Sequence, residues 1–274
     1  MDDIFTGRGA PLTQSGFDAV HARVGGDAAS LWSLLSVETR GFGFLPDRRP
    51  KILFERHIFA ARTGGRFSAG YPDLSNPKAG GYSGGAAEYQ RLKRAMLLDR
   101  RAALDSASWG LGQVMGFNAT KIGYASVDAM VSAFADSEDS QLQGCAGFIT
   151  ANKALHDAYT AQKWARVAFF YNGDQYAKNK YDAKLAAAHA HYTAAGLPSV
   201  GIRAVQAYLA YLGFDPMGID GEPGANTLRA VGRFRTSYTL PAPTLPSAVN
   251  LGQPANVDGH IACLKAAFEA RFPQ

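Results

Sequence analysis

The sequence predicts a mainly α-helical protein, and three observations support this prediction. Long stretches repeat apolar residues at helical spacing. Glycine or proline separates these stretches at intervals typical of helix ends. Only residues 51–54 have the short, continuous apolar character of a strand. The 274 residues are 47% hydrophobic and 19% charged, so the chain can form folded domains rather than a disordered polymer.

The first elements follow from capping residues and breakers. Ser15 is expected to cap a helix over residues 17–23. Asp27 is expected to cap a longer helix over residues 28–40, which ends at Gly41. Both helices carry apolar residues three and four positions apart, so each is expected to bury one face.

After the strand at 51–54, a helix over residues 55–62 is expected to end at a glycine pair. Residues 66–85 are rich in glycine, proline, serine and asparagine and are expected to form a long exposed loop. Loops of this length in compact domains are usually functional or disordered. The remaining helices of this part are expected at residues 86–104, 127–135, 141–156, 164–171 and 180–194.

A glycine and a proline at residues 196–198 interrupt the helical pattern, so a second, smaller domain is expected to begin there. The predicted domains are therefore residues 1–195 and 196–274. Helices are expected in the second domain at residues 200–212, 225–238 and 258–272, with a turn-rich stretch at 213–224.

Composition narrows the classes of partner. The net charge of +5 suits a polyanion such as nucleic acid, an anionic membrane or a bacterial wall. The sequence contains no arginine-rich arm, zinc-finger spacing or basic stripe with aromatics, which disfavours nucleic acid. Asp2 and Asp3 stand where a signal peptide would carry lysines, so we expect synthesis in the cytoplasm without a signal peptide.

Metal and cofactor chemistry are not expected. His189 and His191 are two residues apart on a predicted helix, so their side chains point to different faces and cannot share a zinc ion. Cys145 and Cys263 are too few and too far apart for a metal cluster.

Glu38 is the first candidate catalytic residue. It continues the apolar stripe formed by Leu34 and Leu35 and lies in the last turn of its predicted helix. Burial and the negative end of the helix dipole are both expected to raise its pKa, as a general acid requires. The alternative is a glutamate that extends to solvent or pairs with Arg40.

Three segments carry a family resemblance. Residues 38–44, Glu-Thr-Arg-Gly-Phe-Gly-Phe, resemble the catalytic glutamate segment of lysozyme-like enzymes. Residues 108–115 and 170–173 are similar to the Gly-Leu-Met-Gln and Tyr-Asn-Ala-Gly segments of goose-type lysozymes and lytic transglycosylases. Residues 17–192, which include Ile-Leu-Phe-Glu-Arg-His at 52–57, most closely resemble the N-acetylmuramidase domain of phage endolysins.

This resemblance implies a lysozyme-like helical catalytic domain in which Glu38 is the general acid. It also implies contacts between the saccharide and five residues, for which core packing is the alternative role. These candidate substrate-binding residues are Ser108, Gly110, Gln113, Tyr171 and Asn172. Glycine permits close approach of a sugar, whereas amide, hydroxyl and aromatic groups can bind one.

A glycosidase normally needs a second carboxylate, which acts as base or nucleophile. Glu55, just after the predicted strand, and Asp105, just before the Ser-Trp-Gly segment, are the candidates. Either could instead be structural, Glu55 as a partner of Arg56 and Asp105 as a helix cap.

The second domain contains the pattern Asp-Gly-x-x-Gly-x-x-Thr, formed by Asp220, Gly221, Gly224 and Thr227. This pattern resembles the three-helix peptidoglycan-binding module, which implies that these residues belong to a wall-binding domain. Arg235 replaces the usual glutamine, and the proline-rich segment 239–256 is longer than is usual for the module. A purely structural role for the domain is the alternative.

Together, these resemblances imply an antimicrobial endolysin that hydrolyses the β-1,4 bond between N-acetylmuramic acid and N-acetylglucosamine and lyses the host. Its partner would be peptidoglycan, and a holin-type protein would release it from the host cytoplasm to the wall. We expect a monomer. The alternatives are a lytic transglycosylase, which forms 1,6-anhydro products, and a non-catalytic wall-binding phage structural protein.

Overall fold

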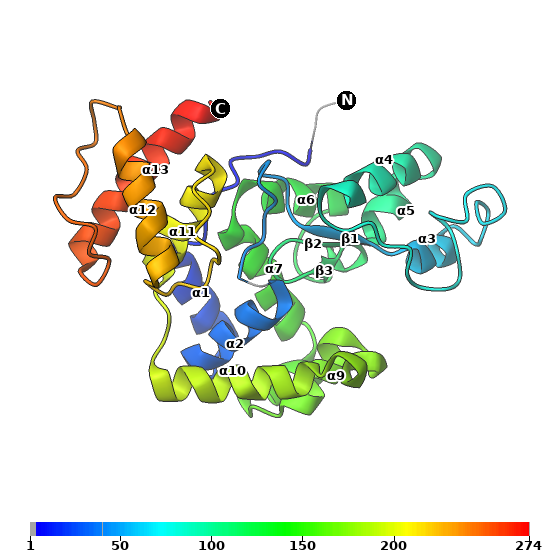
Figure 1. The fold of residues 1–274 in the computed structure, drawn as a ribbon. Helices are drawn as coiled ribbons and strands as arrows, with labels where there is room; N and C mark the ends of the chain where they lie inside the picture. Colours follow the sequence, from blue (N-terminus) through cyan, green and yellow to red (C-terminus); the bar gives the residue numbers. More distant parts are fainter. Residues whose placement is uncertain (1–3, 40, 274) are drawn as a thin grey trace. The chain divides into compact units, whose positions relative to one another are not determined.

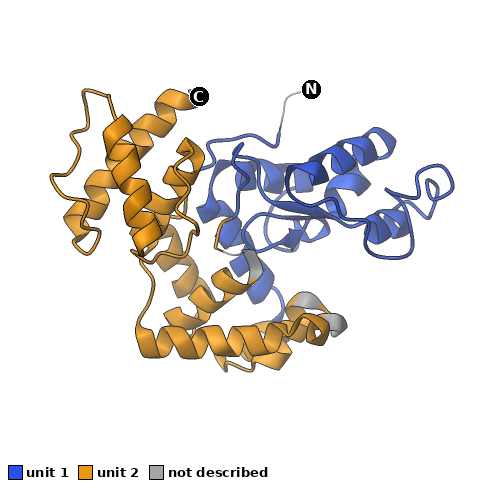
Figure 2. Cartoon of the chain, in the orientation of Figure 1, with its two compact units in different colours: residues 1–9, 43–153 blue, residues 10–42, 154–274 orange. Residues whose placement is uncertain are grey.

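The computed structural model describes the backbone of residues 4–39 and 41–273. The side chains of Glu38, Thr39, Asn172, Asp174 and Gln175 lie outside the described residues. The chain forms two compact units, one of residues 1–9 and 43–153, the other of residues 10–42 and 154–274 (Figure 2). Unit 2 thus combines segments from both sides of the expected boundary after residue 195, and that boundary stays a prediction.

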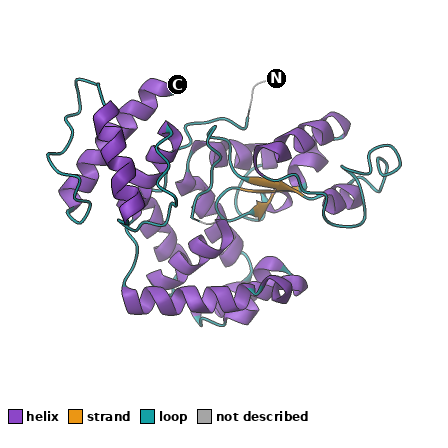
Figure 3. Cartoon of the chain, in the orientation of Figure 1, coloured by secondary structure: helices purple, strands orange, loops and turns teal. Residues whose placement is uncertain are grey.

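Unit 1 contains a small antiparallel sheet in the order β1-β2-β3 (Figure 3). Strand β1 (Ile52–Phe54) pairs with β2 (Ala107–Trp109), which pairs with β3 (Val114–Met115). Of these three strands, only the first is predicted by the sequence pattern. The other two are too short for an alternating apolar pattern to develop.

The helices of unit 1 surround this sheet (Figure 1). They are α3 (Arg56–Arg62), α4 (Glu88–Leu98), α5 (Arg100–Asp105), α6 (Val127–Asp136) and α7 (Glu138–Thr150), with 3-10 turns at Gly85–Ala87 and Gly116–Asn118. Helix α4 packs on β1, and α7 contacts β3. Phe54, Trp109 and Phe134 are fully buried in the core.

Two of the predicted helices are each divided in the structure. The predicted helix 86–104 breaks at Asp99, whose backbone is extended and whose carboxylate accepts a hydrogen bond from Ala102 N at 3.0 Å. Asp99 therefore ends α4 and caps α5, because aspartate satisfies free amides at a helix start. The predicted helix 141–156 is likewise two helices, α7 and α8 (Lys153–Thr160).

Unit 2 consists of helices in its described part. They are α1 (Gln14–Val24), α2 (Ala28–Thr39), α8, α9 (Trp164–Asn172), α10 (Tyr181–Ala195), α11 (Val200–Leu212), α12 (Ala225–Ser237) and α13 (Pro254–Arg271), with a 3-10 segment at Asp174–Asn179. Helix α10 packs along α2, whereas α11 packs on α13 and α12. The expected helix 258–272 thus begins four residues earlier, at Pro254.

The start of α1 corrects one capping residue and the start of α2 confirms another. Thr13, not Ser15, caps α1, because its hydroxyl accepts from Gly16 N at 3.0 Å. Asp27 caps α2, where its carboxylate accepts from Ser30 N at 2.8 Å. Ser33 on α2 is fully buried, and its hydroxyl donates to Ala29 O at 2.6 Å.

Candidate active site

Glu55 lies at the junction between strand β1 and helix α3 in unit 1. Its backbone N donates to Ser106 O at 2.9 Å, which fixes the residue beside β2. The side chain is 16% exposed, so solvent still reaches it. The Tyr82 hydroxyl donates to both carboxylate oxygens, at 2.9 and 3.2 Å. Glu55 is therefore both oriented by the protein and accessible.

The imidazole of His57 lies on the same carboxylate. His57 Nδ1 is 3.2 Å from Glu55 Oε2, although the two atoms are not aligned as a hydrogen bond. A protonated imidazole here would pair with the ionised carboxylate. Neither His57 nor Tyr82 was identified as a site residue from the sequence. The available signal was an isolated aromatic side chain in a glycine- and serine-rich loop.

The loop that carries Tyr82 is anchored by a buried ion pair. Glu88 is fully buried, and its carboxylate accepts from Ser83 N at 2.5 Å and Gly84 N at 3.0 Å. It also accepts from Phe54 N at 3.2 Å and pairs with Arg91 at 2.8 Å. The expected exposed loop is thus tied to the sheet at the residue before Glu55.

Asp105, the other candidate second carboxylate, is enclosed. Its side chain is 5% exposed, and Oδ2 pairs with Arg62 at 2.7 Å and with Arg101 at 3.1 Å. Asp105 is the last residue of α5 rather than the cap at its start, which is Asp99. The carboxylate of Asp105 is therefore ion-paired with two guanidinium groups and has little access to solvent.

Strand β2 and the turn that follows it hold three of the candidate substrate-binding residues. Ser108 donates its hydroxyl to Gln113 Oε1 at 2.9 Å, and Gln113 Nε2 donates to Gly110 O at 2.8 Å. Gly110 has a φ of +65°, and a Cβ at this position would overlap the buried side chain of Gln141. The structure thus joins Ser108, Gly110 and Gln113 in one hydrogen-bonded turn.

The other sequence-predicted catalytic and substrate-binding residues belong to unit 2. Glu38 lies in the last turn of α2, but its side chain is outside the described residues. Tyr171 is half-buried near the end of α9. Asn172, the last residue of that helix, again has a side chain outside the described part.

A buried arginine from α11 binds the chain just after α2. Arg203 is fully buried, and its guanidinium donates to the carbonyl of Gly41. Gly41 has a φ of +84°, and a Cβ there would overlap the carbonyl of Ile219. The segment after the predicted general acid is therefore packed against residues of the expected wall-binding domain, within unit 2.

The Asp-Gly-x-x-Gly-x-x-Thr pattern is organised by Gln206, which is 1% exposed on α11. Gln206 Oε1 accepts from Asp220 N at 3.0 Å and from Gly221 N at 2.8 Å. Its Nε2 donates to Asp220 Oδ1 at 2.8 Å and to Thr227 Oγ1 at 3.0 Å. Asp220, Gly221 and Thr227 are thus brought together around one buried amide, whose role the sequence analysis missed.

Gly224 lies outside this network, at the start of α12. Its φ is −67°, and a Cβ would meet no atom within 4 Å, so the position does not require glycine. Gly221, in contrast, has a φ of +82°, and a Cβ there would lie 2.8 Å from Ser199 O. Of the two glycines in the pattern, only Gly221 is required by the backbone.

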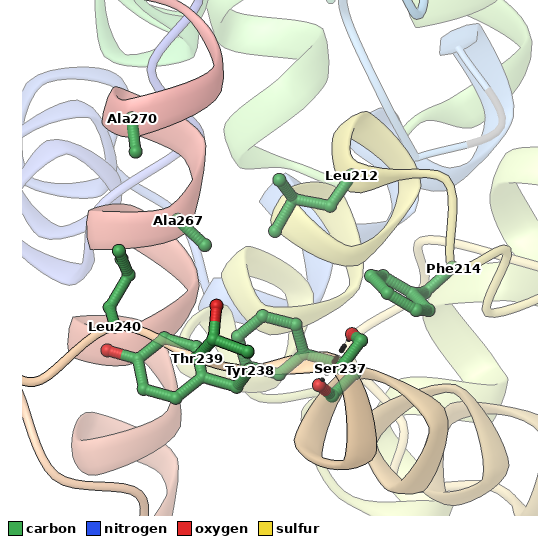
Figure 4. Close-up of a pocket in the computed structure, with 9 residues that line it drawn as sticks. Leu212, Phe214, Ser237, Tyr238, Thr239, Leu240, Ala267 and Ala270 are labelled. Atoms are coloured by element: carbon green, nitrogen blue, oxygen red, sulfur yellow. Dashed lines mark hydrogen bonds between the residues drawn. The ribbon is translucent and has the colours of Figure 1, made fainter.

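A cavity of about 240 Å³ lies among α11, α12 and α13 (Figure 4). It is lined by Leu212, Phe214, Phe234, Ser237, Tyr238, Thr239, Leu240, Ala267 and Ala270. Two of its hydroxyls are engaged, since Ser237 donates to Phe234 O and Tyr238 to Pro243 O, both at 2.9 Å. The residues of the Asp-Gly-x-x-Gly-x-x-Thr pattern do not line this cavity.

Among the described residues, no three His, Cys, Asp or Glu side chains are grouped so that they could hold a metal ion. Within that same part of the chain, no helix has the length and apolar character needed to cross a membrane.

The chain is similar to known proteins in both sequence and structure. A family model described as N-acetylmuramidase matches residues 27–193. The crystal structure of the Burkholderia AP3 phage endolysin is similar, with a TM-score of 0.63 and 42% sequence identity. That match covers 68% of this chain and 72% of the other. None of the curated proteins compared with the chain matched it. Since the family model spans more than half of the sequence, this chain belongs to the N-acetylmuramidase family of glycoside hydrolases.

Proposed function

We propose that this protein is an antimicrobial endolysin that lyses its host by hydrolysing the β-1,4 bond between N-acetylmuramic acid and N-acetylglucosamine in peptidoglycan. Membership of the N-acetylmuramidase family and 42% identity to a phage endolysin support the proposal. The structural observation that carries it is Glu55, an accessible carboxylate oriented by Tyr82. A glycosidase normally needs such a carboxylate in addition to its acid.

Glu38 is the proposed general acid. It lies in the last turn of α2, three residues before Gly41. Carbonyl groups at the end of a helix lack partners within the helix and carry partial negative charge. The proposed role requires a carboxyl group that keeps its proton until it donates it to the leaving oxygen of the glycosidic bond.

Glu55 is the proposed second carboxylate, in preference to Asp105. Asp105 pairs with Arg62 and Arg101 and is 5% exposed, so its function is to hold α3 and α5 together. Glu55 has a neutral hydroxyl donor and reaches solvent. A carboxylate that must accept a proton from water needs this accessibility.

In the proposed reaction, Glu38 donates one proton and Glu55 accepts one. Glu38 transfers its proton to the leaving oxygen as the glycosidic bond breaks. Water adds its hydroxyl to the anomeric carbon, and Glu55 accepts the remaining proton. Exchange with solvent then returns Glu55 to its ionised form and Glu38 to its protonated form.

The five candidate substrate-binding residues are proposed to contact the saccharide. Ser108, Gly110 and Gln113 are bonded to one another, so the saccharide would meet side chains and backbone that are already fixed in position. Tyr171 and Asn172 are proposed to contribute an aromatic ring and an amide.

The expected second domain, residues 196–274, is proposed to bind the wall. Gln206, Asp220, Gly221 and Thr227 would then support a peptidoglycan-binding surface rather than touch the ligand themselves. Tethering to an insoluble substrate raises the effective concentration of the enzyme there. We further propose that the enzyme acts as a monomer, and that a holin-type partner gives it access from the host cytoplasm to the wall.

Mass spectrometry of digested peptidoglycan tests the activity. Hydrolysis yields reducing N-acetylmuramic acid ends, and replacement of Glu38 by glutamine should abolish them. Products with 1,6-anhydro ends would instead identify a lytic transglycosylase. Wall binding without release of any glycan would identify a non-catalytic wall-binding protein.

A further inference from the structure

We propose that Tyr82 is a positioning residue for Glu55 and that its exposed ring forms a preset platform for a pyranose ring of the polysaccharide. This inference rests on the proposed role of Glu55 as the second carboxylate. It assigns a function to the long loop after α3, which the family comparison leaves without one.

The hydroxyl of Tyr82 sets the orientation of the carboxylate. It lies 2.9 Å from Glu55 Oε2 and 3.2 Å from Oε1, so a single donor spans both oxygens. Burial, followed by the hydrogen bond and charge of Glu55, raises the pKa of Tyr82 to about 12. Tyr82 therefore remains a neutral donor at every pH at which the enzyme would work.

The backbone around Tyr82 is held as firmly as its hydroxyl. Glu88 binds the amides of Ser83 and Gly84, the two residues that follow Tyr82. Arg91, itself buried, pairs with Glu88 and donates to the carbonyl of Asp73 earlier in the same loop at 3.1 Å. Two anchors, one at each end of the residue, confine the tyrosine ring to one position.

The ring between these anchors remains open to solvent. Tyr82 is 47% exposed although its hydroxyl is bonded. An aromatic ring that is already immobilised loses little conformational entropy when a ligand stacks on it. The chemical class that fits is a saccharide, because a pyranose has an apolar face for the ring and hydroxyls for neighbouring polar groups.

The surroundings of Glu55 explain why a neutral donor is needed there. His57 Nδ1 approaches Oε2 from α3, and Arg91 on α4 contributes positive charge near Tyr82. Neither side chain fixes the rotation of the carboxylate, since His57 Nδ1 is not aligned as a hydrogen bond and the guanidinium of Arg91 is bonded to Glu88, Phe54 O and Asp73 O. Tyr82 provides the directional contact.

Three variants separate the two parts of the proposal. Tyr82→Phe removes only the hydroxyl, Tyr82→Leu removes the ring as well, and Tyr71→Phe is the matched control. Tyr71 lies in the same loop, is 41% exposed, and its hydroxyl makes no hydrogen bond within the described residues. Each variant is assayed in the full chain on solubilised peptidoglycan, for kcat and KM, with circular dichroism to confirm folding.

We expect Tyr82→Phe to lower kcat about tenfold with little change in KM, as loss of a hydrogen bond to a charged group implies. A purely structural role for Tyr82 would not produce this split between kcat and KM. Tyr82→Leu should additionally raise KM, whereas Tyr71→Phe should behave as the wild type.

The single variant Glu55→Gln, assayed beside this series, distinguishes failure of the proposed function from failure of the further inference. If Glu55→Gln itself retains activity, the proposed role of Glu55 is wrong. If Glu55→Gln is inactive but Tyr82→Phe matches the wild type in kcat, only the positioning role is overturned. An unchanged KM in Tyr82→Leu would overturn the platform.

Discussion

Two regions of the molecule are each organised around one polar side chain, but they differ in how fully that side chain is satisfied. Gln206 is 1% exposed, and both ends of its amide are occupied by backbone and side-chain partners. Glu55 is 16% exposed, and its four acceptor sites receive one hydroxyl in the described structure. The contacts of Gln206 stabilise the fold, whereas Glu55 has acceptor sites left that can receive hydrogen bonds from substrate or water.

The comparison shows that the residues with the most specific sequence pattern need not be the ones that react with substrate. The Asp-Gly-x-x-Gly-x-x-Thr pattern is the more specific sequence signal, and three of its residues meet at the buried amide of Gln206. Glu55 belongs to a less specific sequence segment, but it is the accessible carboxylate to which we assign the catalytic role. The following predictions test whether this contrast holds.

The largest effect is expected for Glu55→Gln, which keeps the shape of the side chain but removes its charge. Loss of a general base lowers turnover by roughly 10²–10⁴-fold. The rate of release of reducing ends measures this loss, and the melting temperature should stay within a few degrees of wild type. Glu222→Gln, an exposed change beside the Gln206 network, is the control and should retain full turnover. Turnover of Glu55→Gln above about a tenth of wild type would place the base elsewhere.

Gln206→Leu should act in the opposite way, on stability rather than on turnover. It leaves the amides of Asp220 and Gly221 without their acceptor. Unpaired groups of this kind cost about 1–3 kcal/mol each, so for the two amides we expect a loss of about 2–6 kcal/mol in unfolding free energy. Urea denaturation measures the loss. A variant as stable as wild type would show that the network contributes nothing to the fold.

Gly221→Ala should be next in size. The φ of +82° and the 2.8 Å approach to Ser199 O together imply a cost of about 1–3 kcal/mol. Gly224→Ser is the matched control, because its extended backbone suits a helix cap and should gain a few tenths of a kcal/mol. Thermal melting of the pair checks both signs, and equal losses would contradict the distinction between the two glycines.

Asp105→Asn should have the smallest effect of these substitutions on stability and turnover. Its partners Arg62 and Arg101 are 36% and 63% exposed, so solvent screens much of the interaction. We expect a loss of about 1 kcal/mol in stability and turnover within about threefold of wild type. Turnover as low as that of Glu55→Gln would reverse the assignment of the two carboxylates.

The sequence predicted most of the helices but few of the hydrogen bonds and ion pairs of the candidate site. Residues 200–212 were predicted as a helix and form α11 with the same bounds. The helix break at Asp99 was missed, because an aspartate inside a helical pattern gives a weak signal until its carboxylate is seen to cap α5. Tyr82 was missed for a different reason, since it is 27 residues from Glu55 along the chain.

The sequence by itself determined the helical class, the family and the identity of the candidate carboxylates. Helices depend on contacts between residues three and four positions apart, and a family motif is a property of the residues themselves. Only the tertiary structure decided which carboxylate is accessible and which is enclosed by arginines. Burial and hydrogen bonding arise between segments far apart in the chain, so the route of the loop after α3 and the position of Gln206 could not be obtained from local patterns.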